Sequence, residues 1–438
     1  RSSELEVWAI SGSGAGTAGF AGSIAINDVG GSNTAQVLGG AVFNASGNAL
    51  VTAETDDQIK SRAGAVGLAG TVGGAGAVAF NDLHADTLAQ VSGAGTTVTA
   101  LGNSAAAQLD NGSLAANGAL AARQQKEAVR GVAVMASSTA EVENYAISAA
   151  GGGSATVAAT VSVALLGGST TAELTSGAEL NTSLGNAAQQ ARVGAFHHDQ
   201  ITSGTGGGAI GGDAGLGGAV DTAVVSHTTE ARVQDASAQA QQAVAVQARS
   251  TTGITQAAIA VGGGTYAGLA GTGALILMDG TTQALVNDSD LASQGSLSVE
   301  ADSKAEIDLI AGALAVSGVA GVGVTAAVTV SEQQTTARVD GNSTLNADGA
   351  TRVGADSTFA QTNHAYTAAA AGGVGVAGTV SVVVVKGNLA HDPEPLLEVI
   401  GLLENLRSAW DEAAQMVAQM RANGQFEGST PGGLNFAG

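Results

Sequence analysis

Residues 336–355 read Thr-Ala-Arg-Val-Asp-Gly-Asn-Ser-Thr-Leu-Asn-Ala-Asp-Gly-Ala-Thr-Arg-Val-Gly-Ala. Small or apolar residues alternate with polar ones in three runs, and Asp340-Gly341 and Asp348-Gly349 separate the runs. Alternation with a period of two indicates β-strands, and Asp-Gly indicates tight turns. The stretch therefore predicts short strands with tight corners, at about eight residues for each strand and its corner.

The same pattern recurs along the chain with a long period. Counterparts of Thr336-Ala-Arg-Val339 begin at Thr34, Leu88, Thr171, Glu230 and Gln283, which gives successive intervals of 54, 83, 59, 53 and 53. Counterparts of Val353-Gly-Ala355 begin at Val51, Val134, Val193, Val246 and Val299. A recurring period of this length is typical of a stack of similar structural units.

One interval exceeds the period. The interval of 83 between Leu88 and Thr171 equals one period of 54 plus 29. The residue numbers of Ala53 and Ala107 likewise differ by 54, and those of Ala107 and Ala136 differ by 29. We therefore predict a partial extra unit at about residues 108–136.

These observations predict an all-β fold, a parallel β-helix or β-solenoid of imperfect repeats of about 53 residues that covers residues 1–388. Asp-Gly can also close antiparallel hairpins, which is the alternative reading of the corners. If one turn of the helix uses about 20–27 residues, and turns stack about 4.8 Å apart, this part would be a rod about 70–90 Å long.

Each repeat also contains a run of small apolar residues, such as residues 257–277. Both faces of a strand with this sequence are apolar, so we expect both to be covered, either by a second wall of the solenoid or by a neighbouring chain. The second possibility predicts self-association through the Gly/Ala/Val strands.

The composition excludes several classes of protein. The formal net charge of −22 repels phosphate backbones and anionic lipids, so we expect no nucleic-acid partner. Residues 309–331 and 367–385 are uncharged and long enough to span a bilayer. Their period-two alternation favours strands instead, and we expect no transmembrane segment.

The ends of the chain predict little about targeting. Residues 1–10 lack the pattern of a signal peptide, and we expect the chain to be part of a longer protein. The absence of cysteine is compatible with export from a Gram-negative cell. We expect an extracellular or outer-surface location.

The sequence changes character from residue 389. Apolar residues then recur at steps of three and four, Asp392 and Pro395 suit a helix start, and Asn423-Gly424 suits a helix end. We predict an amphipathic helix at residues 389–424 that caps or docks on the solenoid. A Gly-rich tail or the start of a further segment follows at residues 425–438.

Few residues suggest chemistry. His197-His198-Asp199 could supply metal ligands, but it aligns with Thr55-Asp56-Asp57, and we expect a solvent-facing turn. Asn287, Asp288 and Asp290 are candidate oxygen ligands for Ca²⁺, as are Asn81, Asp82 and Asp86, although Asn and Asp are also common corner residues. We predict no catalytic residue and no bound cofactor.

The Thr-Ala-x-Val segments, Asp-Gly corners and Ala/Gly/Val runs such as residues 315–324 resemble the repeat regions of large bacterial exoproteins. The similar types are filamentous-haemagglutinin-like and leukotoxin-like proteins of two-partner or autotransporter secretion. The resemblance covers roughly residues 5–388 and rests on composition. It implies an exported right-handed β-helix with roles in adhesion, surface display or cell contact.

Two functions remain open at this point. The first is a structural or adhesive module that mediates cell contact, surface attachment, or matrix or filament assembly, with a host or bacterial cell-surface ligand or further copies of itself as partner. The second is a carbohydrate-active enzyme of the polysaccharide-lyase or glycosidase type built on a β-helix. The enzyme would need carboxylates from successive turns to converge on one groove.

Overall fold

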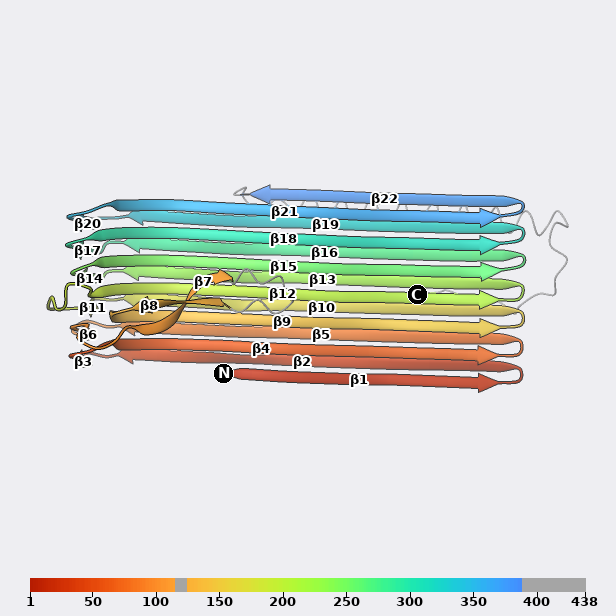
Figure 1. Ribbon diagram of the computed structural model, residues 1–438, viewed down its shortest axis with the longest axis horizontal. Coiled ribbons are helices and arrows are strands. Elements are labelled where there is room, and N and C mark those ends of the chain that lie inside the picture. Colours follow the sequence, from red (N-terminus) through yellow and green to blue (C-terminus); the bar gives the residue numbers. More distant parts are fainter. Residues whose placement is uncertain (115–123, 388–438) are drawn as a thin grey trace.

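The computed structural model describes residues 1–114 and 124–387, and these form a flat β-solenoid of three parallel sheets (Figure 1). Sheet A contains, in spatial order, β1 (Ser2–Ala15), β4 (Ala49–Ala69), β9 (Gly131–Gly152), β12 (Gln190–Gly211), β15 (Ala243–Gly264), β18 (Ser296–Ser317) and β21 (Thr351–Ala371). Sheet B contains β2 (Ala18–Leu38), β5 (Val72–Ser92), β10 (Ala155–Thr175), β13 (Ala214–Gln234), β16 (Ala267–Asn287), β19 (Ala320–Asp340) and β22 (Val374–Gly387). Sheet C contains the short strands β20 (Thr344–Ala347), β17 (Asp290–Ser293), β14 (Ser237–Ala240), β11 (Glu179–Leu180), β6 (Thr97–Ala100) and β3 (Val42–Ala45).

The parallel solenoid predicted from the repeat is confirmed. Neighbouring strands pair in parallel, and residues one repeat apart lie side by side, as Ala243 of β15 does with Ser296 of β18. One coil visits sheets A, B and C in turn, and the repeated side chains therefore form ladders that run along the stack. Each ladder is a row of paired residues on successive strands of one sheet.

The predicted length of a turn was wrong. One coil uses a whole repeat, because two of its three strands are long: β15 has 22 residues and β16 has 21. Of the three runs in residues 336–355, only the middle one is a short strand, while the others end β19 and begin β21. A strand of this length extends about 70 Å, whereas seven stacked strands span about 29 Å. The long dimension therefore runs along the strands and not along the stack.

Tight two-residue turns join sheet A to sheet B. Their backbone continues the hydrogen bonding of the stack, as when Gly212 N donates to Gly152 O. Gly70, Gly153 and Gly212 begin three successive turns, and a Cβ atom on any of them would overlap the carbonyl group of the glycine in the turn below. At these three turns the stacked backbones leave no space for a side chain, whereas Thr265 begins the next turn of the stack and its backbone N donates to Gly212 O.

The core narrows toward these turns. At the wide end, where sheet C closes the coil, Val and Leu side chains such as Val98, Leu174 and Leu297 fill the space between three sheets. Ile and Leu residues, including Ile201 and Leu309, fill the middle. At the narrow end the buried apolar residues of sheets A and B are alanines, with glycines and small polar residues such as Ser148 and Thr160 beside them. The second sheet thus covers the inner face of each Gly/Ala/Val strand.

The residues inserted near position 108 form a hairpin. Strands β7 (Ala107–Leu114) and β8 (Gln124–Val129) pair with each other in antiparallel fashion and do not join sheets A, B or C. Leu109 and Val129 of this hairpin pack on Phe196 of β12, which is fully buried. The additional residues therefore cover part of the outer face of sheet A and do not form a further coil.

Other predictions concern residues outside the described part. The expected helix at residues 389–424 and the segment at residues 425–438 lie beyond it. In residues 1–114 and 124–387, no helix is long and apolar enough to cross a membrane.

Candidate functional site

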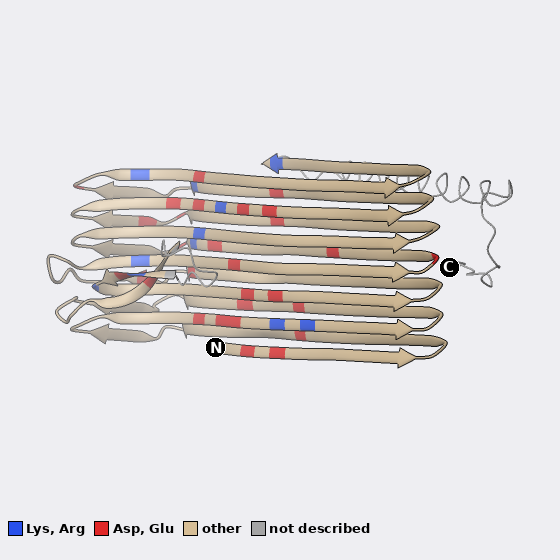
Figure 2. Ribbon diagram, turned by 45° about the vertical axis from the view of Figure 1, so that its right-hand side comes forward, with Lys and Arg blue, Asp and Glu red and all other residues tan. Residues whose placement is uncertain are grey.

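The outer face of sheet A, which points away from sheet B, divides into a charged and an uncharged half. Figure 2 shows the charged residues gathered toward the end of the coil that carries sheet C and the hairpin. The half that leads to the tight turns is almost free of them. Large apolar side chains are exposed there, including Ile10, Leu68, Ile147 and Ile210.

These side chains follow a regular pattern of large and small residues. One ladder contains Ile10, Gly64, Ile147, Gly206, Ile259, Gly312 and Tyr366. A second ladder, four residues further along each strand, contains Gly14, Leu68, Gly151, Ile210, Gly263, Val316 and Ala370. Each strand of sheet A therefore has one large residue and one Gly or Ala at these two positions. The large residues are exposed by between 46% for Val316 and 74% for Ile10.

The packing of the chain itself does not require five of the six glycines of the two ladders; at the sixth, Gly151, a Cβ atom would lie 3.0 Å from Leu68 Cδ2. A Cβ atom at Gly14, Gly64, Gly206, Gly263 or Gly312 would have no neighbour closer than 3.7 Å, and none of these residues has a positive φ. Glycine in the interior of a strand lowers stability relative to Ala by about 0.5–1 kcal/mol. Because the fold does not need them, the glycines indicate a requirement for an open surface at these positions.

The outer face of sheet B carries a shallow apolar groove. Its cavity volume is about 310 Å³, and its lining includes Ala159, Gly218 and Gly271 on neighbouring strands, with Val161 and Val220 beside them. Small residues on adjacent strands thus create a depression that crosses the sheet.

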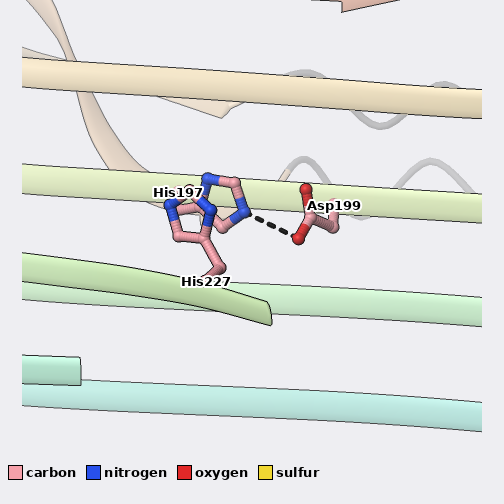
Figure 3. Close-up of side chains that lie close together, drawn as sticks. All are labelled: His197, Asp199 and His227. Carbon is pink, nitrogen blue, oxygen red and sulfur yellow. Dashed lines mark ion pairs between the residues drawn. The ribbon is translucent and has the colours of Figure 1, made fainter. Parts of the chain in front are cut away.

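A second place of interest lies inside the coil, between sheets A and B (Figure 3). His197 and Asp199 lie on β12, two residues apart, so both side chains point to the interior. His227 of β13 reaches the same point from the opposite sheet. The His197 and His227 rings stack, with centroids 3.2 Å apart and planes at 8°. His197 Nε2 lies 2.7 Å from Asp199 Oδ2.

The expectation of a solvent-facing turn at His197-His198-Asp199 was wrong. All three residues are buried, with exposed fractions of 2%, 4% and 2%. The alignment with Thr55-Asp56-Asp57 was correct, because both segments pair with the same residues of β9. That position lies within a long strand and not at a corner.

Burial and charge set the protonation states of this cluster. Burial by itself would raise the pKa of the Asp199 carboxyl, but the positive charge that the neighbouring histidines can carry, His197 above all, lowers it. Burial, together with repulsion from a protonated His197, holds the pKa of His227 well below its usual value. Burial and charge thus act in opposite directions on the pKa of Asp199, whereas burial and the charge of His197 act in the same direction on that of His227.

The hydrogen bonding of the cluster is incomplete. Both ring nitrogens of His197 and the Oδ2 atom of Asp199 are buried without a hydrogen-bond partner in the described structure. His197 Nε2 and Asp199 Oδ2 nevertheless form the ion pair of 2.7 Å described above, so the Nδ1 atom of His197 is the one of the three with neither kind of partner. Buried polar atoms in this state are costly and are normally satisfied.

The candidate calcium ligands belong to a corner between sheets B and C. Asp288 has a φ of 47° and accepts hydrogen bonds from the Asn342 backbone N, at 2.9 Å, and from Asn287 Nδ2, at 3.0 Å. Asp290 begins β17. The carboxylate of Asp288 thus connects two successive corners, which is the role expected of a corner residue.

The other candidate group for calcium is divided between two faces. Asn81 is buried in the interior, where its Oδ1 atom accepts a hydrogen bond of 3.0 Å from Asn27 Nδ2. Asp82 follows it on the strand and points to the opposite face. Asp86 lies 3.7 Å from His84 Nε2 at the surface.

Carboxylates from different coils meet on the outer face of sheet A. Glu6 and Glu143 lie in one ladder, and Arg62 binds both, at 3.1 and 3.3 Å. The Arg62 guanidinium also stacks on the Trp8 ring at 4.7 Å. Lys60 lies between the two carboxylates in the same ladder, with its Nζ atom 3.6 Å from Glu143, so Lys60 and Arg62 together balance their charge.

No known protein family matches this chain, and neither a characterised protein nor a solved structure is similar to it.

Proposed function

We propose that this chain is a structural module that assembles laterally with a second copy of itself through the outer face of sheet A. The observation that supports the proposal is the alternation of large and small residues in the two ladders of that face. As a wider role we propose an extracellular or bacterial surface module for adhesion or matrix assembly.

The pattern is complementary to itself. A two-fold axis along the stack, midway between the two ladders, would exchange the two positions on each strand. Ile147 of one copy would then meet Gly151 of the other, and Ile210 would meet Gly206. Two-fold interfaces of this kind use the same surface on both copies, and large side chains fitting beside small ones form dry contacts.

Charge and polarity favour a second copy over another partner. At a net charge of −22, two chains repel each other unless their charged surfaces stay apart. The ladders lie in the half of the face that is almost free of charge, so the contact would keep most of the acidic side chains outside the interface. Exposed large apolar side chains that form a continuous surface across seven strands are typical of an interaction surface.

The location and the adhesive role rest on the sequence. Long repeats, the absence of cysteine and the resemblance to bacterial exoproteins support them. The carbohydrate-active enzyme stays the alternative. For that alternative, Glu6 and Glu143 are carboxylates on one ladder, but Arg62 binds both of them.

Sedimentation equilibrium over a range of protein concentrations tests the proposal. We expect reversible self-association of the wild-type chain and at least about a tenfold weaker association of Ile259→Lys, because a charge would enter an apolar contact. Thr255→Lys is the matched control, since it adds the same charge to the same face of β15 outside the ladders. A wild-type chain that stays monomeric, or equal association of both variants, would contradict the proposal.

A further inference from the structure

The cluster of His197, Asp199 and His227 occurs in one coil of the stack. In the neighbouring coils, Ser138 and Ser250 take the place of His197, Ala140 and Thr252 that of Asp199, and Gly168 and Gly280 that of His227. Small residues thus surround three ionisable side chains that meet from two sheets. The neighbouring coils fold with small residues at these positions, so the repeat does not require the three ionisable side chains in this coil.

The atoms of the cluster can converge on one point. One nitrogen or oxygen atom from each of the three side chains lies within 4.8 Å of the others. A cavity of about 10 Å³ adjoins all three side chains, and a second one of about 10 Å³ lies on the other side of His227. A space of this size holds about one water molecule or ion.

From this geometry we infer that His197, Asp199 and His227 bind one divalent transition-metal ion of the zinc type. Two imidazole nitrogens and one carboxylate oxygen are a frequent ligand set for such ions, with water in the remaining position. Ca²⁺ and Mg²⁺ prefer sets made of oxygen alone. A bound ion would also satisfy the buried atoms of His197 and Asp199 that lack hydrogen-bond partners.

Coordination requires a change in the two rings. Stacked parallel imidazoles do not direct their nitrogen lone pairs to one point, so at least one ring must turn when the ion binds. His227 has room to turn on the side of Gly280, where a Cβ atom would have no neighbour closer than 3.9 Å and where the second cavity lies. The hydroxyl of Thr170, 3.1 Å from His227 Nε2, can hold the ring by its other nitrogen.

The position of the cluster gives the ion a role in the coil. Because β12 belongs to sheet A and β13 to sheet B, the ion would connect the two sheets across the interior of the middle coil. It would act as a structural cross-link independent of the outer faces.

Zinc binding by the whole chain tests this inference. Protein freed of metal with a chelator is titrated with ZnCl₂ by calorimetry, and the bound metal is counted by elemental analysis after dialysis. We expect one zinc ion per chain and a higher thermal midpoint with zinc. His197→Ser and His227→Gly, which copy the neighbouring coils, should each weaken binding at least about 100-fold.

Three further measurements separate this site from zinc at exposed groups. His84→Ser removes an exposed histidine next to Asp86 and should leave the affinity unchanged. Asp199→Asn keeps the shape of the side chain and should weaken binding even if the smaller variants fail to fold. Co²⁺ should give an absorption spectrum of nitrogen and oxygen ligands that both histidine variants lose. The inference is overturned if dialysed wild-type protein retains no zinc, or if the histidine variants retain as much as it does.

Discussion

Gly207 of β12 faces Gly218 of β13 across the narrow end of the coil, and a Cβ atom on Gly207 would overlap the Gly218 carbonyl group. The next residue, Gly208, points to the outer face and would have no neighbour within 4 Å of a Cβ atom. Two adjacent glycines thus serve different purposes: one permits the two sheets to approach, and the other leaves an outer surface open.

This difference predicts opposite effects of the same substitution. Gly207→Ala should lower the free energy of unfolding by about 2 kcal/mol, because two backbones must move apart. Gly208→Ala should raise it by about 0.5–1 kcal/mol, because an unhindered glycine within a strand is less favourable than alanine. Urea denaturation of both variants measures the effect. Equal stabilities would mean that the narrow end is not packed as described.

The two ladders predict a pair of compensating substitutions. Gly206→Ile places a large residue where the second copy presents Ile210, so self-association should weaken while stability is retained. In Gly206→Ile/Ile210→Gly the two positions are exchanged, each isoleucine again meets a glycine, and association should return. Sedimentation measures both variants. A double variant that associates no better than the single one would rule out the two-fold arrangement.

Asp221 predicts a pH dependence of stability. It is fully buried on β13, and burial raises its pKa to about 6, although the polar side chains of Gln256, Ser203 and Ser162 oppose part of the shift. Because the pKa is higher in the folded state, the protonated carboxyl favours folding. This contribution is complete below the unfolded pKa of about 4 and is lost as the pH rises through about 6.

Asp221→Ala tests this dependence, since Ala274 occupies the equivalent position in the next coil. Relative to the wild type, the variant should gain about 2–3 kcal/mol of stability between pH 4 and pH 7. Unfolding by urea at several pH values gives the difference between the two proteins. A difference that does not change with pH would show that Asp221 does not titrate in this range.

Phe196 predicts how firmly the hairpin is attached. Its ring is fully buried against Leu109 and Val129, so Phe196→Ala should lower stability by about 3 kcal/mol. Faster hydrogen exchange in β7 and β8 should accompany the loss. Phe20→Ala is the control, because Phe20 is 68% exposed and its loss should cost well under about 1 kcal/mol. Unchanged exchange would mean that Phe196 does not hold the hairpin.

The similarity between residues one repeat apart in the sequence predicted much of this fold. In a parallel solenoid such residues become neighbours, so similarity between segments one repeat apart is a direct signal of contact. The alignment of His197 with Thr55 was correct for this reason, and so was the choice of parallel strands over hairpins. Local chemistry was also sufficient to locate corners such as Asp340-Gly341, where Gly341 has a φ of 66°.

Contacts across a coil could not be predicted in this way. The position at which each long strand ends determines which inward side chains face each other across the coil. In runs of Gly, Ala and Val this position cannot be predicted, because the two faces of such a strand have similar residues. The length of a coil was therefore underestimated. For the same reason the approach of His227 to His197 could not be foreseen, since the two residues do not occupy equivalent positions of the repeat.

The sequence by itself determined the β-solenoid, its repeat and the ladders of equivalent residues, because parallel stacking in register turns a period in the chain into contacts in space. Only the tertiary structure decided which face of each strand is buried, that Ile147 and Gly206 are neighbours on the outer face of sheet A, and that His197, Asp199 and His227 meet. Those relations depend on how two long sheets are placed opposite each other, and that placement follows from packing between residues that have no fixed separation in the sequence.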